Sequence, residues 1–411
     1  MHTPDTASAP QQLPTLKEWT SLIGDVKHTY TYDGRSVVDF QPPDEGWIGR
    51  VIHNWKEHVK NTPPYPGNFS GRGIVTCAGG VKYLTCAWVC ITMLRKLGCT
   101  LPVEMWYTDN EINQEMKDAL AELKVECKDV KDYNRKYRGL KGFALKPFAI
   151  LNSSFKEVLF LDADNNCVAD PTYLFETDAY KMHGAIFWPD CRMIDKNNPI
   201  YTIVDYDDYN SYEQESGQLL IDKERCWTEL NLCMYFNTKP QTFYKLLYGD
   251  KDTFRFAWIA LRTPFHMISK PVGFCGFRDR DKGFCNTTLV QHDPDGNILF
   301  LHRNWFKWSQ MLDDEVMWSV IKRFKPGATR RHVVKHFISR HDGALAFFDC
   351  EGDVEEVPFS ELFGDYELQC LDILKKFRNN ERYGRFLLHS YFCVTRDGYT
   401  AGFMDKVGEN I

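Results

Sequence analysis

Residues 157–164, EVLFLDAD, carry an apolar strand directly into two carboxylates. Residues 158–161 are four consecutive apolar side chains, as in a strand that is buried on both faces. Asp162 and Asp164 follow, with one alanine between them. Neighbouring carboxylates repel each other, so both cannot serve as ordinary turn caps. A divalent cation held between them would remove the repulsion.

The stretch is one step in an alternation of strands and helices. Predicted strand segments are 73–80, 101–108, 125–130 and 157–164, and predicted helical segments are 81–98, 109–123 and 139–151. This alternation predicts an α/β fold with a doubly wound, mostly parallel sheet and helices on both faces. In such sheets, ligands bind beyond the carboxyl ends of the strands, where the strand order reverses.

The first strand also ends in an unusual turn, 76–80, TCAGG. If the first and fourth strands are neighbours, this turn faces the aspartate pair. It is too short for a GxGxxG motif and lacks the lysine of a P-loop, so it does not indicate a dinucleotide or ATP site. The backbone amides of Ala78, Gly79 and Gly80 could still approach a nucleotide; a plain strand-to-helix turn is the alternative.

A third metal ligand is expected from the hairpin 287–308, which has DPDG at its tip. If His292 pairs near Asn297, His302 pairs near Thr287, and roughly 16 Å separates the two histidines. They cannot share one ion. His292 would lie beside the exposed turn, whereas His302 heads toward the sheet, so we predict His302 as the ligand. A core or surface histidine is the alternative, and an imidazole beside carboxylates favours Mn²⁺ over Mg²⁺.

Two other interpretations of the aspartate pair remain. The aspartyl-phosphate phosphatase signature DxDx(T/V) belongs on a first strand, whereas here the motif follows the fourth, and Asn166 stands in the Thr/Val place. Turn capping is the other.

Composition restricts the class of protein further. The 411 residues carry a net charge of −6 and no basic tract, which argues against nucleic acid as a partner. No apolar stretch of about 18 residues indicates a membrane span. The fourteen cysteines form no CxxC pair, which favours reduced, buried thiols and a cytoplasmic location. A Golgi lumen is expected instead if the chain is trimmed from a longer one.

The motifs, taken in order, resemble the GT-A glycosyltransferases, and most closely the fungal α-mannosyltransferase family that extends mannan chains. The resemblance covers about residues 67–310 and rests on these segments: GRGIVTCAGG, VEMWYTDNE, LKGFALKPFAIL, VLFLDADN, AIFWPD, ESGQLLIDK, GDKDTFRFAW and HRNWFKW. The wider group, which includes glycogenin and bacterial galactosyltransferases, follows its DxD with a later His and a Lys-Pro-Trp. His302, Lys307 and Trp308 resemble that pattern, one residue shorter and without the proline.

The resemblance implies a GT-A catalytic domain over 67–310, an amino-terminal arm with a short helix over 1–66, and a carboxy-terminal extension over 311–411 packed on the catalytic domain. It implies transfer of mannose from GDP-mannose to a glycan acceptor with retention, to give an α-linkage. The donor-binding residues would be Ala78, Gly79, Gly80, Lys146, Asp162 and Lys307. The metal, Mn²⁺ or Mg²⁺, would be held by Asp162, Asp164 and His302.

Candidate catalytic acids are Glu215, Asp250 and Asp252, which would shield an oxocarbenium-like carbon, bind sugar hydroxyls or act as a nucleophile. Capping of the helix that follows is the alternative for Asp250 and Asp252. An exposed surface lysine is the alternative for Lys146. Two other functions stay open: transfer of xylose, galactose or glucose from a UDP donor, and a non-catalytic sugar-nucleotide or glycan-binding protein of the same fold.

Overall fold

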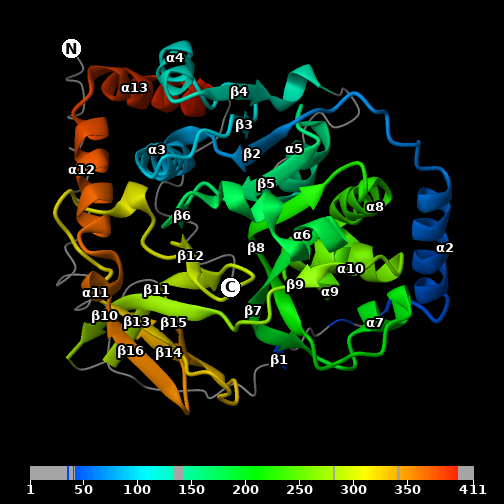
Figure 1. Ribbon diagram of the computed structural model, residues 1–411. Coiled ribbons are helices and arrows are strands. Elements are labelled where there is room, and N and C mark those ends of the chain that lie inside the picture. Colours follow the sequence, from blue (N-terminus) through cyan, green and yellow to red (C-terminus); the bar gives the residue numbers. More distant parts are fainter. Residues whose placement is uncertain are drawn as a thin grey trace, which may run out of the picture.

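The computed structural model describes residues 35–36, 40, 42–133, 142–280, 283–339 and 343–396. A central sheet has the order β1-β7-β8-β5-β2-β3-β4, with β9 beside β7. In Figure 1 these strands follow one another from β4 at the top to β7 near the bottom. They are β1 (Arg35–Ser36), β2 (Arg72–Cys77), β3 (Val103–Tyr107), β4 (Val125–Asp129), β5 (Glu157–Leu161), β7 (Ala185–Ile194), β8 (Tyr212–Asp222) and β9 (His266–Met267).

The predicted fold class, an α/β fold with a doubly wound, mostly parallel sheet and helices on both faces, is confirmed. Strands β4, β3, β2 and β5 are parallel, and β8 is antiparallel to both β5 and β7. The first and fourth predicted strands, β2 and β5, are indeed neighbours, with Val75 opposite Phe160. The strand order therefore reverses between β2 and β5, beside the aspartate pair.

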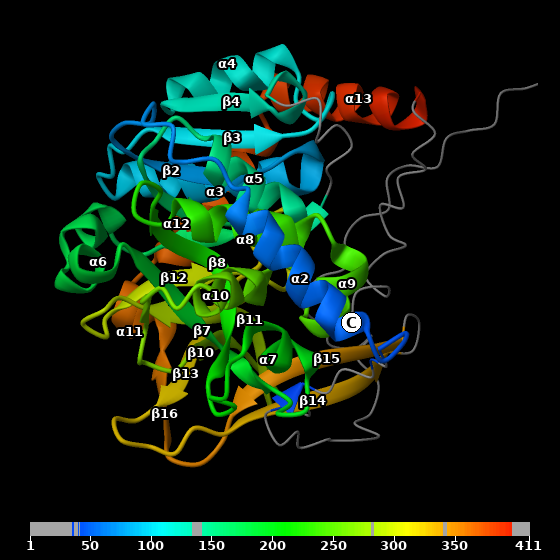
Figure 2. The same ribbon diagram turned by 90° about the vertical axis from the view of Figure 1, so that its right-hand side faces the viewer.

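Helices cover both faces of this sheet (Figures 1 and 2). They are α2 (Trp47–Lys60), α3 (Gly80–Lys96), α4 (Gln114–Glu122), α5 (Leu145–Asn152), α6 (Asp178–His183), α7 (Pro199–Val204), α8 (Trp227–Asn237), α9 (Pro240–Leu246) and α10 (Lys251–Ala260). Predicted helix 109–123 begins only at Gln114, because Asn113 caps it by accepting the Met116 amide at 3.0 Å. Of the predicted helix 139–151, residues 139–141 lie outside the described residues.

The apolar run of β5 is explained by these two helical layers. Leu159 and Leu161 join the core that contains α3, whereas Val158 and Phe160 join the core that contains α5 and α8. All four side chains are buried. A strand that is covered on both faces has no polar face. No side chain in this run is charged, and the two carboxylates come only beyond its end, at Asp162 and Asp164.

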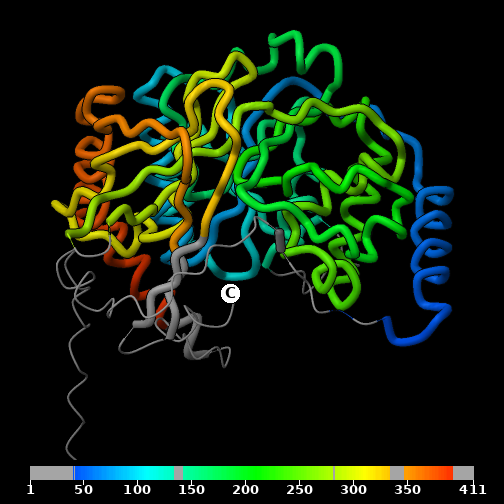
Figure 3. The backbone as a smooth tube through the Cα atoms, turned by 90° about the horizontal axis from the view of Figure 1, so that it is seen from below, coloured from blue at the N-terminus to red at the C-terminus, as the bar shows by residue number. Residues whose placement is uncertain are grey.

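A second, antiparallel sheet has the order β16-β13-β10-β11-β12-β6. Its strands are β6 (Asn165–Cys167), β10 (Gly273–Asp279), β11 (Gly283–His292), β12 (Ile298–His302), β13 (Val320–Phe324) and β16 (Val354–Pro358), and a hairpin, β14 (His332–Ser339) and β15 (Gly343–Cys350), lies beside it. In Figure 3 this yellow and orange part occupies one side and the green α6–α10 region the other.

Residues beyond 310 interlock with the rest of the chain. Strand β13 pairs with β10, and β16 pairs with β13, so they complete the second sheet. The chain then forms α11 (Phe359–Phe363), α12 (Tyr366–Arg378) and α13 (Glu381–Arg396). Helix α12 packs on α3, and α13 lies alongside α4 (Figures 1 and 2). The predicted boundary at residue 310 thus falls inside a continuous packing unit.

Two expectations from composition concern the whole described chain. Every described cysteine is a free thiol, and most are buried, as predicted. Among the described residues, no helix is long and apolar enough to cross a membrane.

Candidate metal centre

The three predicted metal ligands lie together at the carboxyl end of β5. One ligand atom each from Asp162, Asp164 and His302 falls within 4.8 Å of the others. The Nε2 atom of His302 is 3.3 Å from Asp164 Oδ1 and 3.9 Å from Asp162 Oδ2. These residues meet because β6, which follows the aspartates, pairs with β12 and sets Asn165 opposite His302. Two carboxylates and an imidazole at this spacing are suited to one divalent cation.

The hairpin that carries His302 differs from the expected register. His302 lies opposite Leu289 rather than Thr287, because His292 pairs with Ile298 rather than Asn297 and the β11–β12 ladder slips by one further residue between Gln291 and His292. His292 is not beside exposed solvent as predicted but fully buried. Burial lowers the pKa of His292 to about 3, so it remains neutral. The choice of His302 over His292 stands on the distances above.

Lys146 is buried rather than on the surface. Its ammonium lies 2.8 Å from both the carbonyl oxygen and the hydroxyl of Ser216, 3.2 Å from Asp162 and 3.3 Å from Asp250. Burial lowers the pKa of Lys146, but the charges of Asp162 and Asp250 outweigh it and raise that pKa above its ordinary value. All three N–H groups have acceptors within the fold, so Lys146 holds Asp162 in place instead of reaching out to a ligand.

Lys307 forms an ion pair with Asp164. It precedes Trp308, whose fully buried indole donates a hydrogen bond to Asn166 Oδ1 at 2.9 Å. Burial lowers the pKa of Lys307 to about 8, which is still above neutral, so its ammonium is charged beside Asp164. Lys307 therefore lies beside the candidate metal ligands, paired with Asp164.

Glu215 lies behind the imidazole. Its Oε1 is 2.9 Å from His302 Nδ1 and accepts the Gly217 amide at 2.5 Å, and its Oε2 accepts from the Gln218 amide group. Burial lowers the pKa of His302, yet the charge and hydrogen bond of Glu215 and the charge of Asp162 raise it above its ordinary value. Sequence reasoning grouped Glu215 with acids that face a sugar; its carboxylate instead contacts a metal ligand.

The two other candidate acids lie in different surroundings. Asp250 is 5% exposed and ion-paired with Lys146, and although it begins α10 its side chain makes no capping bond. Asp252 is fully buried, accepts the Gln214 amide at 2.9 Å and pairs with Lys251 and Arg255. This geometry does not support Asp252 as a substrate-facing acid, because its charge is used inside the fold. Asp250 is linked to Asp162 through Lys146, which contacts both carboxylates.

The glycine turn lies at the end of β2, beside the aspartate pair. Two of its amides are used inside the fold: Ala78 N donates to Trp106 O at 3.0 Å and Gly80 N to Glu111 O at 3.2 Å. A Cβ at Gly79 would meet Glu111 Oε2 at 2.2 Å, and Gly80 has a φ of +60°. The glycines are thus required by the approach of Glu111 and by the turn, and the amides of Ala78 and Gly80 are not available to a nucleotide.

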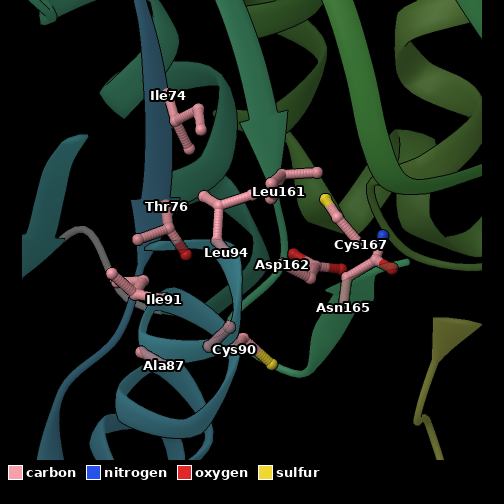
Figure 4. A pocket seen from close by; sticks show the side chains of 11 residues that line it. Ile74, Thr76, Ala87, Cys90, Ile91, Leu94, Leu161, Asp162, Asn165 and Cys167 are labelled. Atoms are coloured by element: carbon pink, nitrogen blue, oxygen red, sulfur yellow. The ribbon is translucent and has the colours of Figure 1, made fainter. Parts of the chain in front are cut away.

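A small pocket lies between α3 and the sheet, on one side of Asp162 (Figure 4). It is lined by Ile74, Thr76, Ala87, Cys90, Ile91, Leu94, Leu161, Asp162, Ala163, Asn165 and Cys167. Asp162, Asn165 and Cys167 lie at one end, and Thr76 and mostly apolar side chains line the rest (Figure 4). This lining offers no cation to a diphosphate, so we do not assign the donor to it.

Gly217 has no room for a side chain beside the candidate metal ligands. A Cβ at Gly217 would lie 2.5 Å from both Glu215 Oε1 and His302 Nδ1. We expect Gly217→Ala to displace the imidazole and weaken Mn²⁺ binding by about 10–100-fold, the loss typical when the groups that orient a metal-binding histidine are disturbed. Isothermal titration calorimetry with Mn²⁺ measures it.

Gly49→Ala in α2 is the matched control, because a Cβ there meets nothing within 4 Å. Equal Mn²⁺ affinity of Gly217→Ala and Gly49→Ala would contradict the steric argument.

The sequence is similar to those of known mannosyltransferases, and a family model matches the region that contains Asp162 and Asp164. The chain matches the model of a family described as "Mannosyltransferase putative" over residues 71–214 and 203–293, more than half of its length. It is 30% identical over 289 residues to α-1,2-mannosyltransferase MNN5 of Saccharomyces cerevisiae, which covers 55% of this chain and 49% of that protein. It is 26% identical over 305 residues to α-1,2-mannosyltransferase MNN2 of Candida albicans, covering 59% and 51%.

The chain thus spans about half the length of the curated relatives it matches. Among solved structures, the mannosyltransferase Ktr4p of S. cerevisiae aligns with 58% of this chain and 79% of its own, at 12% identity and a TM-score of 0.32.

Proposed function

The chain belongs to the family of putative mannosyltransferases, and on that premise we propose that it is a metal-dependent retaining glycosyltransferase. It would move mannose from GDP-mannose to a glycan acceptor. The relatives are named α-1,2-mannosyltransferases, so we propose an α-1,2 linkage. The observation that carries the proposal is the cluster of Asp162, Asp164 and His302.

The charges around the cluster suit a divalent cation. The carboxylates of Asp162, Asp164, Glu215 and Asp250 are linked by contact to the ammonium groups of Lys146 and Lys307 and to His302, whose imidazole would be neutral when it binds a metal. This leaves two negative charges in excess, which one divalent cation neutralises. Ligation by two carboxylates and one imidazole favours Mn²⁺, with Mg²⁺ as the alternative.

The residues divide the work of the reaction. A cation bound by Asp162, Asp164 and His302 would supply a Lewis acid against the charge of the departing diphosphate. Lys307 would move from Asp164 to the diphosphate and bind it through a charge-assisted hydrogen bond. Asp250 contacts Lys146 and Ser216 through Oδ2, and its Oδ1 would face the positive charge that develops on the sugar carbon. Retention needs no general base from the protein, because the departing phosphate takes the acceptor's proton on the same face.

The donor is tested by calorimetric titration of GDP-mannose, UDP-glucose, UDP-galactose and UDP-xylose, each with and without Mn²⁺. We expect GDP-mannose to bind more tightly than any UDP-sugar, as in a mannosyltransferase. We also expect it to bind only with Mn²⁺, because the diphosphate oxygens complete the ion's coordination. Release of GDP on addition of an α-mannoside acceptor would then distinguish transfer from glycan binding alone.

Preference for a UDP-sugar would reject mannose from GDP-mannose while leaving glycosyl transfer in place. Binding of GDP-mannose without any GDP release in the presence of mannosides would favour the non-catalytic alternative.

A further inference from the structure

We infer that residues 215–218, Glu-Ser-Gly-Gln, form a bracket that positions the metal ligands, and that Glu215 acts through His302 rather than on the sugar. The inference rests on the metal-dependent function proposed above. The bracket is an irregularity of β8: against β7, Ile186 pairs with Leu220 but Trp188 pairs with Glu215. Strand β8 therefore holds extra residues here, and these bulge at the carboxyl end of β5.

The backbone of the bracket fixes the aspartate turn. The carbonyl oxygen of Gly217 accepts the Asp162 amide at 2.8 Å and the Asn165 side-chain amide at 2.8 Å. The carbonyl oxygen and hydroxyl of Ser216 accept from Lys146, which in turn contacts Asp162. Residues 216 and 217 thus hold Asp162 both through its backbone amide and through Lys146.

The side chains of the bracket fix the imidazole. Gln218 donates to Glu215, and its Oε1 accepts from Asn165 at 2.7 Å, so the carboxamide is held at both ends. Glu215 then accepts from His302 Nδ1 at 2.9 Å. A carboxylate can only accept, so a proton lies on Nδ1, and in the neutral imidazole the lone pair is then on Nε2, which faces Asp162 and Asp164. Glu215 therefore selects the tautomer that a metal needs.

The same contacts leave Glu215 no role at the sugar. Its Oε1 is shared by His302 and the Gly217 amide, and its Oε2 is bound by Gln218. The residue is only 4% exposed. A nucleophile or a partner for sugar hydroxyls needs an oxygen that the substrate can reach, and both oxygens are turned inward.

Partners of this kind, which hold a metal-binding histidine, typically change metal affinity by about 10–100-fold when removed. We expect Glu215→Ala to weaken Mn²⁺ binding by that factor, and Glu215→Gln by less, since its carboxamide oxygen can still accept from Nδ1. The measurement is Mn²⁺ affinity by calorimetry, or by the electron paramagnetic resonance signal of the free ion, with no sugar present. Glu104→Gln is the control: Glu104 is a buried acid of β3 that accepts from Ser154 and Trp106.

A double-variant cycle decides whether Glu215 acts through the imidazole. In a His302→Ala background, Glu215→Ala should leave Mn²⁺ affinity unchanged within twofold. An equal loss in both backgrounds would overturn the inference, as would a Glu215→Ala protein that binds Mn²⁺ normally but transfers sugar slowly. A wild-type protein that binds no Mn²⁺ would instead remove the proposed function, and the two failures are therefore distinguishable. Melting curves identify any variant that has not folded.

Discussion

Asp164→Asn is expected to reduce Mn²⁺-dependent sugar transfer by about a thousandfold, which corresponds to about 4 kcal/mol of transition-state stabilisation. Asp164 contributes one oxygen to the metal cluster, 3.3 Å from His302, and its other oxygen pairs with Lys307. An amide keeps the size of the side chain but carries no charge. The substitution would therefore weaken metal binding and also leave Lys307 without its ion-pair partner.

Initial rates of GDP release with Mn²⁺, donor and a mannoside acceptor measure this effect, and calorimetry gives the accompanying loss of Mn²⁺ affinity. Asp170→Asn is the matched control: Asp170 follows the same turn but accepts the Thr172 amide at 3.0 Å at the start of a 3₁₀ helix. Its rate should stay close to that of the wild type. Retention of a tenth or more of the wild-type rate by Asp164→Asn would mean that Asp164 is not a ligand.

Glu367→Ala is expected to lower the free energy of unfolding by about 3–5 kcal/mol, because it leaves a buried guanidinium without its counter-charge. Arg303 is fully buried, and its Nη1 lies 2.8 Å from Glu367 Oε1. Glu367 also accepts the amides of Met317 and Trp318 at 3.1 and 2.6 Å. One carboxylate of α12 therefore satisfies three buried donors.

Urea denaturation followed by tryptophan fluorescence measures the change in the free energy of unfolding. Glu361→Ala on α11, an exposed neighbour, should change stability by no more than about 0.5 kcal/mol. If Glu367→Ala unfolds at the same urea concentration as Glu361→Ala, Arg303 must find another acceptor or water, and the ion pair contributes little.

The parts of the site that the sequence predicted are those that depend on local pattern. The apolar run of β5 and the alternation of strands and helices before it can be recognised from neighbouring residues alone. Together they place Asp162 and Asp164 at the end of a strand. His302 was found because the hairpin around DPDG has a strong turn signal. Its opposite residue was predicted wrongly, because the slip between Gln291 and His292 leaves no mark in composition.

The parts that were missed depend on contacts between distant segments. In the sequence nothing distinguishes Glu215 from the other candidate acids. In the fold, the irregularity of β8 places its Oε1 2.9 Å from His302 Nδ1. Lys146 follows the pattern of a helix that could be exposed, and only the tertiary fold encloses it between Ser216 and Asp250. The best available signal was Gly217, since a glycine inside an apolar strand often marks a bulge or a close approach.

The pairing of β6 with β12 gives the molecule one further property. Asp162 and Asp164 end a strand of the central sheet, whereas His302 ends a strand of the second sheet, and β6 joins the two. An ion that takes ligands from both would act as a cross-link between segments far apart in the chain. Separation of the two sheets and loss of the catalytic centre would then be a single event, so no partly opened form of this protein could hold its metal with all three ligands.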